Sequence, residues 1–142
     1  DPECQVILPR LKSDFSELCE ALCSGRLKEY KAVWDNGAAV CVVLASRGYP
    51  GSYSKGKVIT GLNMAEEDPR VAVFHAGTRL EDDRLLTDGG RVLGVTATDR
   101  DLASAMMSAY EAVNKIHFDG MHYRRDIGAK GLGAGVRIPN LK

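Results

Sequence analysis

The chain reads Asp88-Gly89-Gly90-Arg91-Val92-Leu93-Gly94-Val95-Thr96-Ala97-Thr98 at its most informative point. Asp-Gly-Gly is a turn sequence, and the apolar and β-branched residues that follow it are typical of a strand. Similar short runs lie upstream at Ala38 to Ala45, Lys57 to Thr60 and Val71 to Phe74. No stretch between these runs has a clear helical period, which argues against parallel strands with helical crossovers. We therefore expect a small antiparallel or barrel-like sheet.

Two amphipathic helices are predicted on either side of these strands. The first follows Ser13 as its N-cap and ends before Gly25. Its apolar residues have helical spacing: Phe15, Leu18, Cys19, Leu22 and Cys23. The second starts near Thr98, with Asp101 as the acidic partner of its cap. Its apolar residues also share one stripe, in which methionine fills the core: Leu102, Ala105, Met106, Ala109, Val113 and Ile116. The predicted fold class is α+β, with helices at the side or ends of the sheet.

Composition excludes several classes of function. The 142 residues contain 19 Lys and Arg against 19 Asp and Glu, so the formal net charge is zero. A neutral chain has no general attraction for nucleic acid or for an anionic membrane surface. The longest mainly apolar run, Ala38 to Ala45, is too short to cross a bilayer as a helix. We expect a soluble, cytoplasmic protein with neither kind of partner.

The four cysteines, Cys4, Cys19, Cys23 and Cys41, are interpreted as reduced thiols packed in a cytosolic protein. Cys19 and Cys23 are four residues apart and share one predicted helix face, a spacing that could supply two of the four ligands of a zinc site. No second His or Cys pair at ligand spacing completes it, so no metal site is predicted.

Glycine-rich segments suggest anion binding only weakly. Gly51 to Val58 nearly matches a phosphate-binding P-loop, but Val58 stands where a hydroxyl must bind magnesium, and no helix start follows. The segment is either a turn that approaches an anion with backbone donors, Lys55 and Lys57, or a hairpin loop with solvated lysines. Gly131 to Gly135 has glycine spacing without a following helix, so it is no dinucleotide site.

Three further polar positions each allow two interpretations. His75 ends an apolar strand next to glycine, where it is either a hydrogen-bonded structural histidine or a polar group lining a cleft. Arg91 directly follows two glycines. Its guanidinium either holds a phosphate with two hydrogen bonds or pairs with a nearby Asp. The run Tyr123-Arg124-Arg125-Asp126 allows the same two interpretations.

Five ordered segments together resemble one family. They are Asp1-Pro2-Glu3-Cys4-Gln5-Val6-Ile7-Leu8-Pro9, Leu44-Ala45-Ser46-Arg47-Gly48-Tyr49-Pro50-Gly51, Val73-Phe74-His75-Ala76-Gly77-Thr78, Gly89-Gly90-Arg91-Val92-Leu93-Gly94-Val95-Thr96-Ala97 and Tyr123-Arg124-Arg125-Asp126-Ile127-Gly128. In this order they are similar to the C-terminal part of the glycinamide ribonucleotide synthetases, also called phosphoribosylamine–glycine ligases. The resemblance runs from Asp1 to Gly128, about nine-tenths of the chain.

The resemblance implies an ATP-grasp ligase of de novo purine synthesis. In that family ATP phosphorylates the carboxylate of glycine, and the amine of 5-phosphoribosylamine attacks the acyl phosphate to give glycinamide ribonucleotide. The implied cofactors are ATP with Mg²⁺ or Mn²⁺, whose family ligands lie a few residues before the Asp-Pro-Glu-Cys-Gln motif. The implied partners are 5-phosphoribosylamine, glycine and the upstream ATP-grasp domain. The chain alone is therefore expected to be inactive.

The resemblance also implies domain limits. Residues 1–29 would be the C-terminal end of the ATP-grasp domain, and residues 30–128 the family's C-terminal domain, a small β-rich barrel called a rudimentary hybrid motif. The family pattern breaks after Gly128. Residues 129–142 are expected to form a Gly-rich, flexible tail or linker, and the natural C-terminus stays open.

Substrate-binding residues are implied in the same way. Related enzymes hold the substrate's 5-phosphate with a Gly-Arg-x-x-Gly turn, which Gly90 and Arg91 match. A second basic phosphate ligand lies seven residues before that Arg, where Arg84 stands. An acid that touches the ribose or amine side corresponds to Asp1, and His75 is retained as a candidate that lines the cleft. The alternative is a non-catalytic structural or linker domain of a multifunctional purine-synthesis protein.

Overall fold

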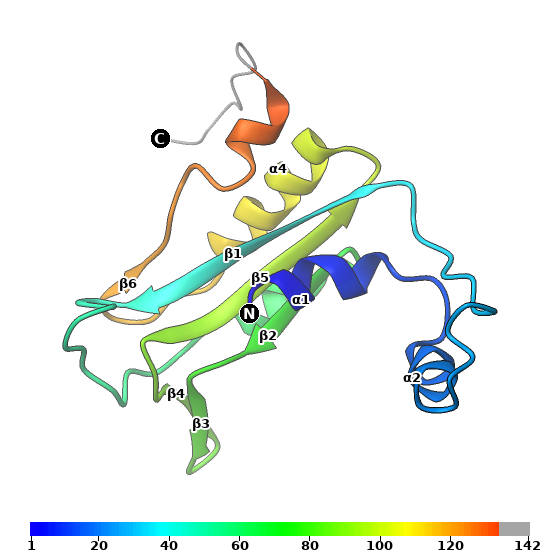
Figure 1. The fold of residues 1–142 in the computed structure, drawn as a ribbon. Coiled ribbons are helices and arrows are strands. Elements are labelled where there is room, and N and C mark those ends of the chain that lie inside the picture. The colour runs from blue at the N-terminus through cyan, green and yellow to red at the C-terminus, as the bar shows by residue number, and fades with distance from the viewer. Residues whose placement is uncertain (134–142) are drawn as a thin grey trace.

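The computed structural model describes residues 1–133 and has the predicted α+β architecture (Figure 1). Its elements in chain order are α1 (Glu3–Ile7), the 3-10 helix η1 (Leu8–Arg10), α2 (Phe15–Cys23), β1 (Ala38–Ser46), α3 (Leu62–Ala65), β2 (Val71–His75), β3 (Thr78–Glu81), β4 (Arg84–Thr87), β5 (Arg91–Asp99), α4 (Leu102–Val113), β6 (Met121–His122) and the 3-10 helix η2 (Ala129–Leu132). Three predicted strands and both long helices are therefore present.

The main sheet has the strand order β2-β5-β1-β6, and every neighbouring pair is antiparallel. The longest pairing joins β1 to β5, from Ala38 opposite Asp99 to Ala45 opposite Arg91. Both strands are covered on both faces, which explains why they read as continuous apolar runs. The antiparallel prediction is confirmed. The sheet has two edge strands, β2 and β6, so the barrel-like closure is not confirmed.

Helix α4 packs against one face of the sheet and supplies much of the core (Figure 1). Its N-cap is Asp101, whose Oδ1 accepts a hydrogen bond from the Ser104 N–H at 2.8 Å. Met106 is fully buried, as expected of a residue that fills the core. The core continues beyond the helix with Ile116 and Phe118. Helix α1 lies on the opposite face, so the sheet is a layer between helices.

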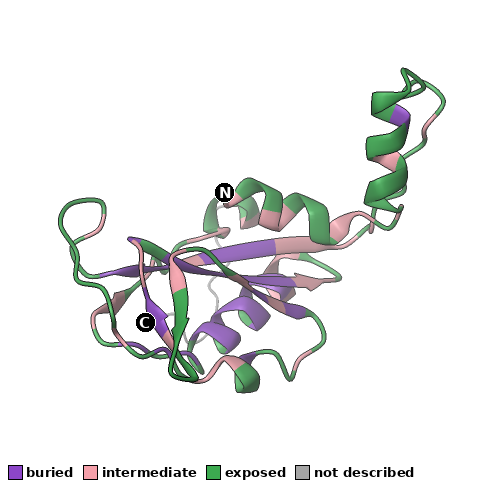
Figure 2. Ribbon diagram, turned by 90° about the horizontal axis from the view of Figure 1, so that it is seen from below, coloured by how far each residue is buried: buried purple, intermediate pink, exposed green. Residues whose placement is uncertain are grey.

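Helix α2 forms where predicted but stands apart from the sheet, as Figure 2 shows. Its N-cap is Asp14 rather than Ser13, because the Ser13 hydroxyl accepts a hydrogen bond from the Val33 N–H instead. Ala21 is the helix's one buried residue, while Phe15 is 51% exposed. The apolar stripe of this helix therefore faces solvent.

The predicted packing of the cysteine side chains is correct for one residue only. Cys41 is buried in β1, where desolvation raises the pKa of its thiol. Cys4, Cys19 and Cys23 are exposed, so their predicted packing is wrong. All four thiols are free, as predicted. For Cys19 and Cys23, helical spacing gives the side of the helix on which the cysteine lies but not whether another element covers that side.

Two β elements differ from the prediction. Lys57 to Thr60 forms isolated bridges rather than a strand, with Val58 opposite Leu86. The hairpin β3–β4 was not predicted, and it turns at Asp82 and Asp83, both of which have positive φ. Such turns usually contain glycine, and Asp is one of the few other residues that tolerates this backbone region.

The end of the described chain packs on α4. Helix η2 contacts α4, and Leu132 is a partly buried residue packed against the core. Residues 134–142 lie outside the described part of the chain. The expectation of a tail or linker over 129–142 therefore stays a prediction, although its first four residues form η2.

Candidate functional site

The turn between β4 and β5 is the structural centre of the candidate site. A Cβ on Gly90 would lie 2.8 Å from Cε2 of Tyr49, and one on Gly89 would lie 2.8 Å from the Cα of Gly77. Both distances are too short for a side chain, so packing requires glycine at these two positions. The Gly77 N–H also donates to the Arg91 carbonyl at 2.9 Å. The turn is therefore held firmly, and Arg91 leaves it as the first residue of β5.

Arg91 and Asp1 are brought together across 90 residues of sequence. Nη2 of Arg91 lies 3.2 Å from Oδ2 of Asp1, and the two side chains are 44% and 40% exposed. The sequence allowed Arg91 either to bind a phosphate or to pair with a nearby Asp, and the structure shows the ion pair. An exposed pair of this kind stabilises the fold by at most about 1 kcal/mol. Both side chains therefore remain accessible to a ligand.

His75 closes β2 on the strand beside Arg91. It is opposite Leu93 in the β2–β5 pairing, and its Nδ1 lies 3.0 Å from Oγ1 of Thr78. The residue is exposed. It thus has the hydrogen bond of a structural histidine and the accessibility of a ligand contact.

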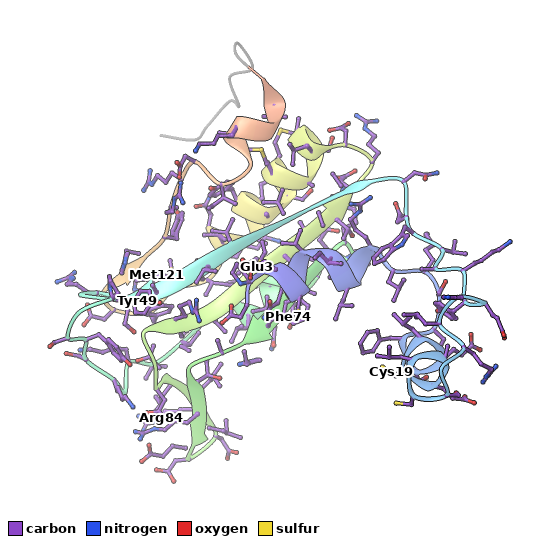
Figure 3. All side chains as sticks on the ribbon, in the orientation of Figure 1. Glu3, Cys19, Tyr49, Phe74, Arg84 and Met121 are labelled. Atoms are coloured by element: carbon purple, nitrogen blue, oxygen red, sulfur yellow. The ribbon has the colours of Figure 1, made fainter. Side chains whose placement is uncertain are left out.

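Arg84 lies elsewhere in the fold. It opens β4 opposite Glu81 in the β3–β4 hairpin, which extends away from the main sheet (Figure 3). Over residues 1–133, no hydrogen bond or ion pair joins Arg84 to Arg91 or Asp1. The arrangement therefore groups Asp1, Gly90 and Arg91, with His75 on the adjacent strand and Arg84 on a separate hairpin.

The glycine-rich segment after β1 has no P-loop geometry. Val58 is followed by an isolated bridge at Thr60 and then by the four-residue helix α3. Its lysines are half exposed and ion-paired, Lys55 with Asp88 at 3.3 Å and Lys57 with Asp119 at 2.9 Å. The segment nevertheless contributes Tyr49 to the packing around Gly90. The sequence analysis did not predict that role for Tyr49.

In the run Tyr123-Arg124-Arg125-Asp126, the structure shows an ion pair, which is one of the two interpretations given above. Nη2 of Arg124 lies 2.7 Å from Oδ2 of Asp126, and this pairing lowers the pKa of Asp126. The guanidinium of Arg125 lies over the ring of Tyr123, 5.8 Å from its centroid. The two arginines therefore contact neighbours within the same short run.

Two features are missing from residues 1–133. No group of three His, Cys, Asp or Glu side chains in this range could hold a metal ion. None of the helices there has the length and apolar character needed to cross a membrane. The described residues therefore offer no fit for the Mg²⁺ or Mn²⁺ that the sequence resemblance implies.

Comparison with known proteins finds one matching family and similar proteins with related names. The family profile described as "Phosphoribosylglycinamide synthetase, C domain" matches residues 39–130. A phosphoribosylamine–glycine ligase of Synechocystis is 51% identical over 133 residues, which cover 93% of this chain and 32% of that protein. The trifunctional purine biosynthetic protein adenosine-3 of Gallus gallus is 50% identical over 133 residues, 93% of this chain and 13% of that protein.

A solved structure agrees with the sequence relatives. The crystal structure of the phosphoribosylamine–glycine ligase of Thermotoga maritima has a TM-score of 0.68 and 36% identity to this chain. The similarity covers 89% of this chain and 30% of that structure. The chain thus spans a third or less of the length of the relatives described here.

Proposed function

The chain belongs to the phosphoribosylglycinamide synthetase C-domain family, and from this premise we propose that it is the C-terminal part of a phosphoribosylamine–glycine ligase. The observation that carries the proposal is the family match over residues 39–130, together with 51% identity to the phosphoribosylamine–glycine ligase of Synechocystis. The whole enzyme would join glycine to 5-phosphoribosylamine in purine biosynthesis, using ATP to activate the glycine carboxylate as an acyl phosphate.

The nucleotide and the metal belong to the part of the ligase that this chain does not contain. No suitable group of ligands exists in residues 1–133, and phosphoryl transfer requires a metal that neutralises charge. The chain by itself would therefore not catalyse the reaction. Its contribution is to bind and orient a substrate, since holding two reactants in place removes much of the entropic barrier.

Residues 1–29 would be the closing segment of an ATP-grasp domain. The exposed large apolar side chains in and next to α2, Phe15, Leu22 and Leu27, support this assignment, because another part of the protein could cover them. Residues 30–128 would be the C-terminal domain, a rudimentary hybrid motif that borders the active site.

Arg91 would bind the 5-phosphate of phosphoribosylamine. Its rigid glycine turn supports this role, because a guanidinium held in place binds phosphate oxygens with little further loss of entropy. Asp1 lies beside it and would accept hydrogen bonds from the ribose or amine side of the substrate. His75 on the neighbouring strand and Arg84 on the hairpin are further candidates for the same ligand.

Kinetics of the full-length ligase test this assignment. Arg91→Ala is expected to raise the KM for phosphoribosylamine about tenfold or more, since it removes a charge-assisted hydrogen bond to the phosphate. The KM for ATP should remain within about twofold of the original value, because the proposed nucleotide site lies elsewhere. Arg100→Ala is the matched control, because Arg100 is highly exposed and pairs only with its neighbour Asp101 among the described residues. An unchanged KM for phosphoribosylamine would contradict the role of Arg91 and favour a purely structural domain.

A further inference from the structure

A cavity of about 450 Å³, lined mostly by residues with polar side chains, lies beside the segment that follows β1. Cavities of this size hold small organic ligands in other proteins. Figure 3 labels Tyr49 and Met121 at this end of the sheet. The side chains that give the cavity its chemistry are Arg47, Ser52, Tyr53, Ser54, Lys57 and Asp119. Neither Arg91 nor Asp1 lines it. Its lining residues Ser46 and Tyr53 lie against the Gly89–Gly90 turn, so the cavity borders the site proposed above without including its charged pair.

The cavity wall is held in place at both ends of the segment. The Ser46 hydroxyl donates to the Gly89 carbonyl at 2.9 Å, and the Gly56 N–H donates to the Thr87 carbonyl at 2.7 Å. Gly48 has a φ of 96° and leaves no room for a Cβ beside the Ser52 carbonyl. A wall fixed in this way loses little conformational entropy when a ligand binds.

The charges in the cavity favour an anion. Arg47 and Lys57 carry two positive charges, and Asp119 is the one carboxylate among the lining residues. Lys57 pairs with Asp119 at 2.9 Å and is the main cause of the lowered pKa of that carboxyl, to which Arg47 also contributes. Within residues 1–133, Arg47 forms no ion pair. Its guanidinium therefore has donors available for a ligand.

The same wall offers uncharged donors. Among the described residues, no protein acceptor pairs with the backbone N–H groups of Ser52, Tyr53 and Ser54. The hydroxyls of Ser52 and Ser54 are also without protein partners in that part of the chain. Consecutive backbone N–H groups and hydroxyls beside a guanidinium are the donors that bind phosphate oxygens.

We propose that this cavity is a second phosphate-binding site, which takes a small phosphorylated sugar. Arg47 and the donors of Ser52 to Ser54 bind the phosphate, and Asp119 accepts hydrogen bonds from the sugar hydroxyls. The combination of cation and carboxylate matches a ligand with an anionic end and a hydroxylated end. This inference goes beyond the ligase proposal, which places the substrate phosphate at Arg91.

NMR titration of the ¹⁵N-labelled chain tests the proposal with three probes: ribose 5-phosphate, inorganic phosphate and ribose. Ribose 5-phosphate is expected to shift the backbone amide signals of Ser52, Tyr53 and Ser54, and to bind more tightly than inorganic phosphate. Ribose alone should leave these signals unchanged, because it lacks the group that Arg47 binds. Arg47→Gln should weaken ribose 5-phosphate binding about tenfold or more, since it removes a hydrogen bond to a charged group.

Two variants make the outcome unambiguous. Arg100→Gln removes an exposed arginine outside the cavity and should leave the affinity unchanged. Lys57→Gln tests the second cation and should also weaken binding. The proposal is overturned if Arg47→Gln binds as tightly as the original chain, or if binding is lost with Arg91→Gln and retained with Arg47→Gln. The titration reads binding by the chain itself, so a failure of the ligase proposal would not change its result.

Discussion

Two regions of the molecule have similar sequence patterns but differ in burial. One is the main sheet with α4, which is well buried, and the other is the N-terminal segment, residues 1–37, which is mostly exposed. Helices α2 and α4 both have an aspartate N-cap and an apolar stripe. Seven residues of α4 are buried, against one of α2 (Figure 2). The family profile begins at residue 39, where the well-packed region begins. Helical periodicity therefore predicts which side of a helix is apolar, whereas burial depends on whether another element covers it.

The N-terminal segment consequently has many large apolar side chains that are exposed. Its exposed apolar residues are Ile7, Leu8, Phe15, Leu22, Leu27, Val33 and Trp34. Under the proposed function, the remainder of the ligase would cover these side chains. The two regions should then respond very differently to the same substitution in the isolated chain.

Two phenylalanine substitutions give the largest expected contrast. Phe118 is 1% exposed in the core, so Phe118→Ala should lower the free energy of unfolding by about 3–5 kcal/mol. Phe15 is 51% exposed on α2, so Phe15→Ala should change it by less than about 0.5 kcal/mol. Urea denaturation of the chain, followed by circular dichroism, measures both values. Equal losses would mean that α2 is packed in solution, which would contradict the contrast between the two regions.

Gly90→Ala is expected to have a smaller effect, located at the candidate site. The added Cβ would press on the ring of Tyr49, and such overpacking costs about 1–3 kcal/mol. Tyr49→Ala removes the obstructing ring, so the double variant should lose less stability than the sum of the two single variants. Strictly additive losses would show that the ring of Tyr49 is not what excludes a side chain at position 90.

The predicted elements are those whose sequence signals are local. Strands β1, β2 and β5 follow from β-branched runs, and α4 from its spacing and its Asp101 cap. The hairpin β3–β4 escaped prediction because its turn has aspartates, Asp82 and Asp83, rather than glycine. The solvent-facing stripe of α2 also escaped, because the sequence of a helix does not reveal which element covers it.

The candidate site also has one part that the sequence predicts and another part that it does not. The Gly90-Arg91 turn could be predicted, since adjacent glycines before a strand are a local signal. The choice between a phosphate and an aspartate as partner of Arg91 could not, because Asp1 lies 90 residues away in sequence and comes close only through α1 and β5. Arg47 and Asp119 line one cavity for the same kind of reason, as two loops meet there. Spacing along the chain carries no information on such pairs.

The smallest expected difference between the two regions is in how their stability depends on pH. Hydrogen bonds from the guanidinium and the backbone N–H of Arg70 lower the pKa of Asp68 from 3.8 to about 2. The carboxylate thus stabilises the fold fully above pH 3.8, and this contribution is lost as the pH falls toward 2. Because the pair is at the surface, the loss should be at most about 1 kcal/mol.

Asp68→Asn should therefore flatten the decline in the free energy of unfolding between about pH 4 and pH 2, as measured by urea denaturation at several pH values. Asp35 is the matched residue of the N-terminal segment, since Lys12 lowers its pKa through a hydrogen bond. Asp35→Asn should leave the decline almost unchanged, because that segment is poorly buried and its local opening contributes little to global unfolding. If Asp35→Asn flattened the curve as strongly as Asp68→Asn, the two regions would unfold as one cooperative unit, and their contrast in burial would not be a contrast in stability.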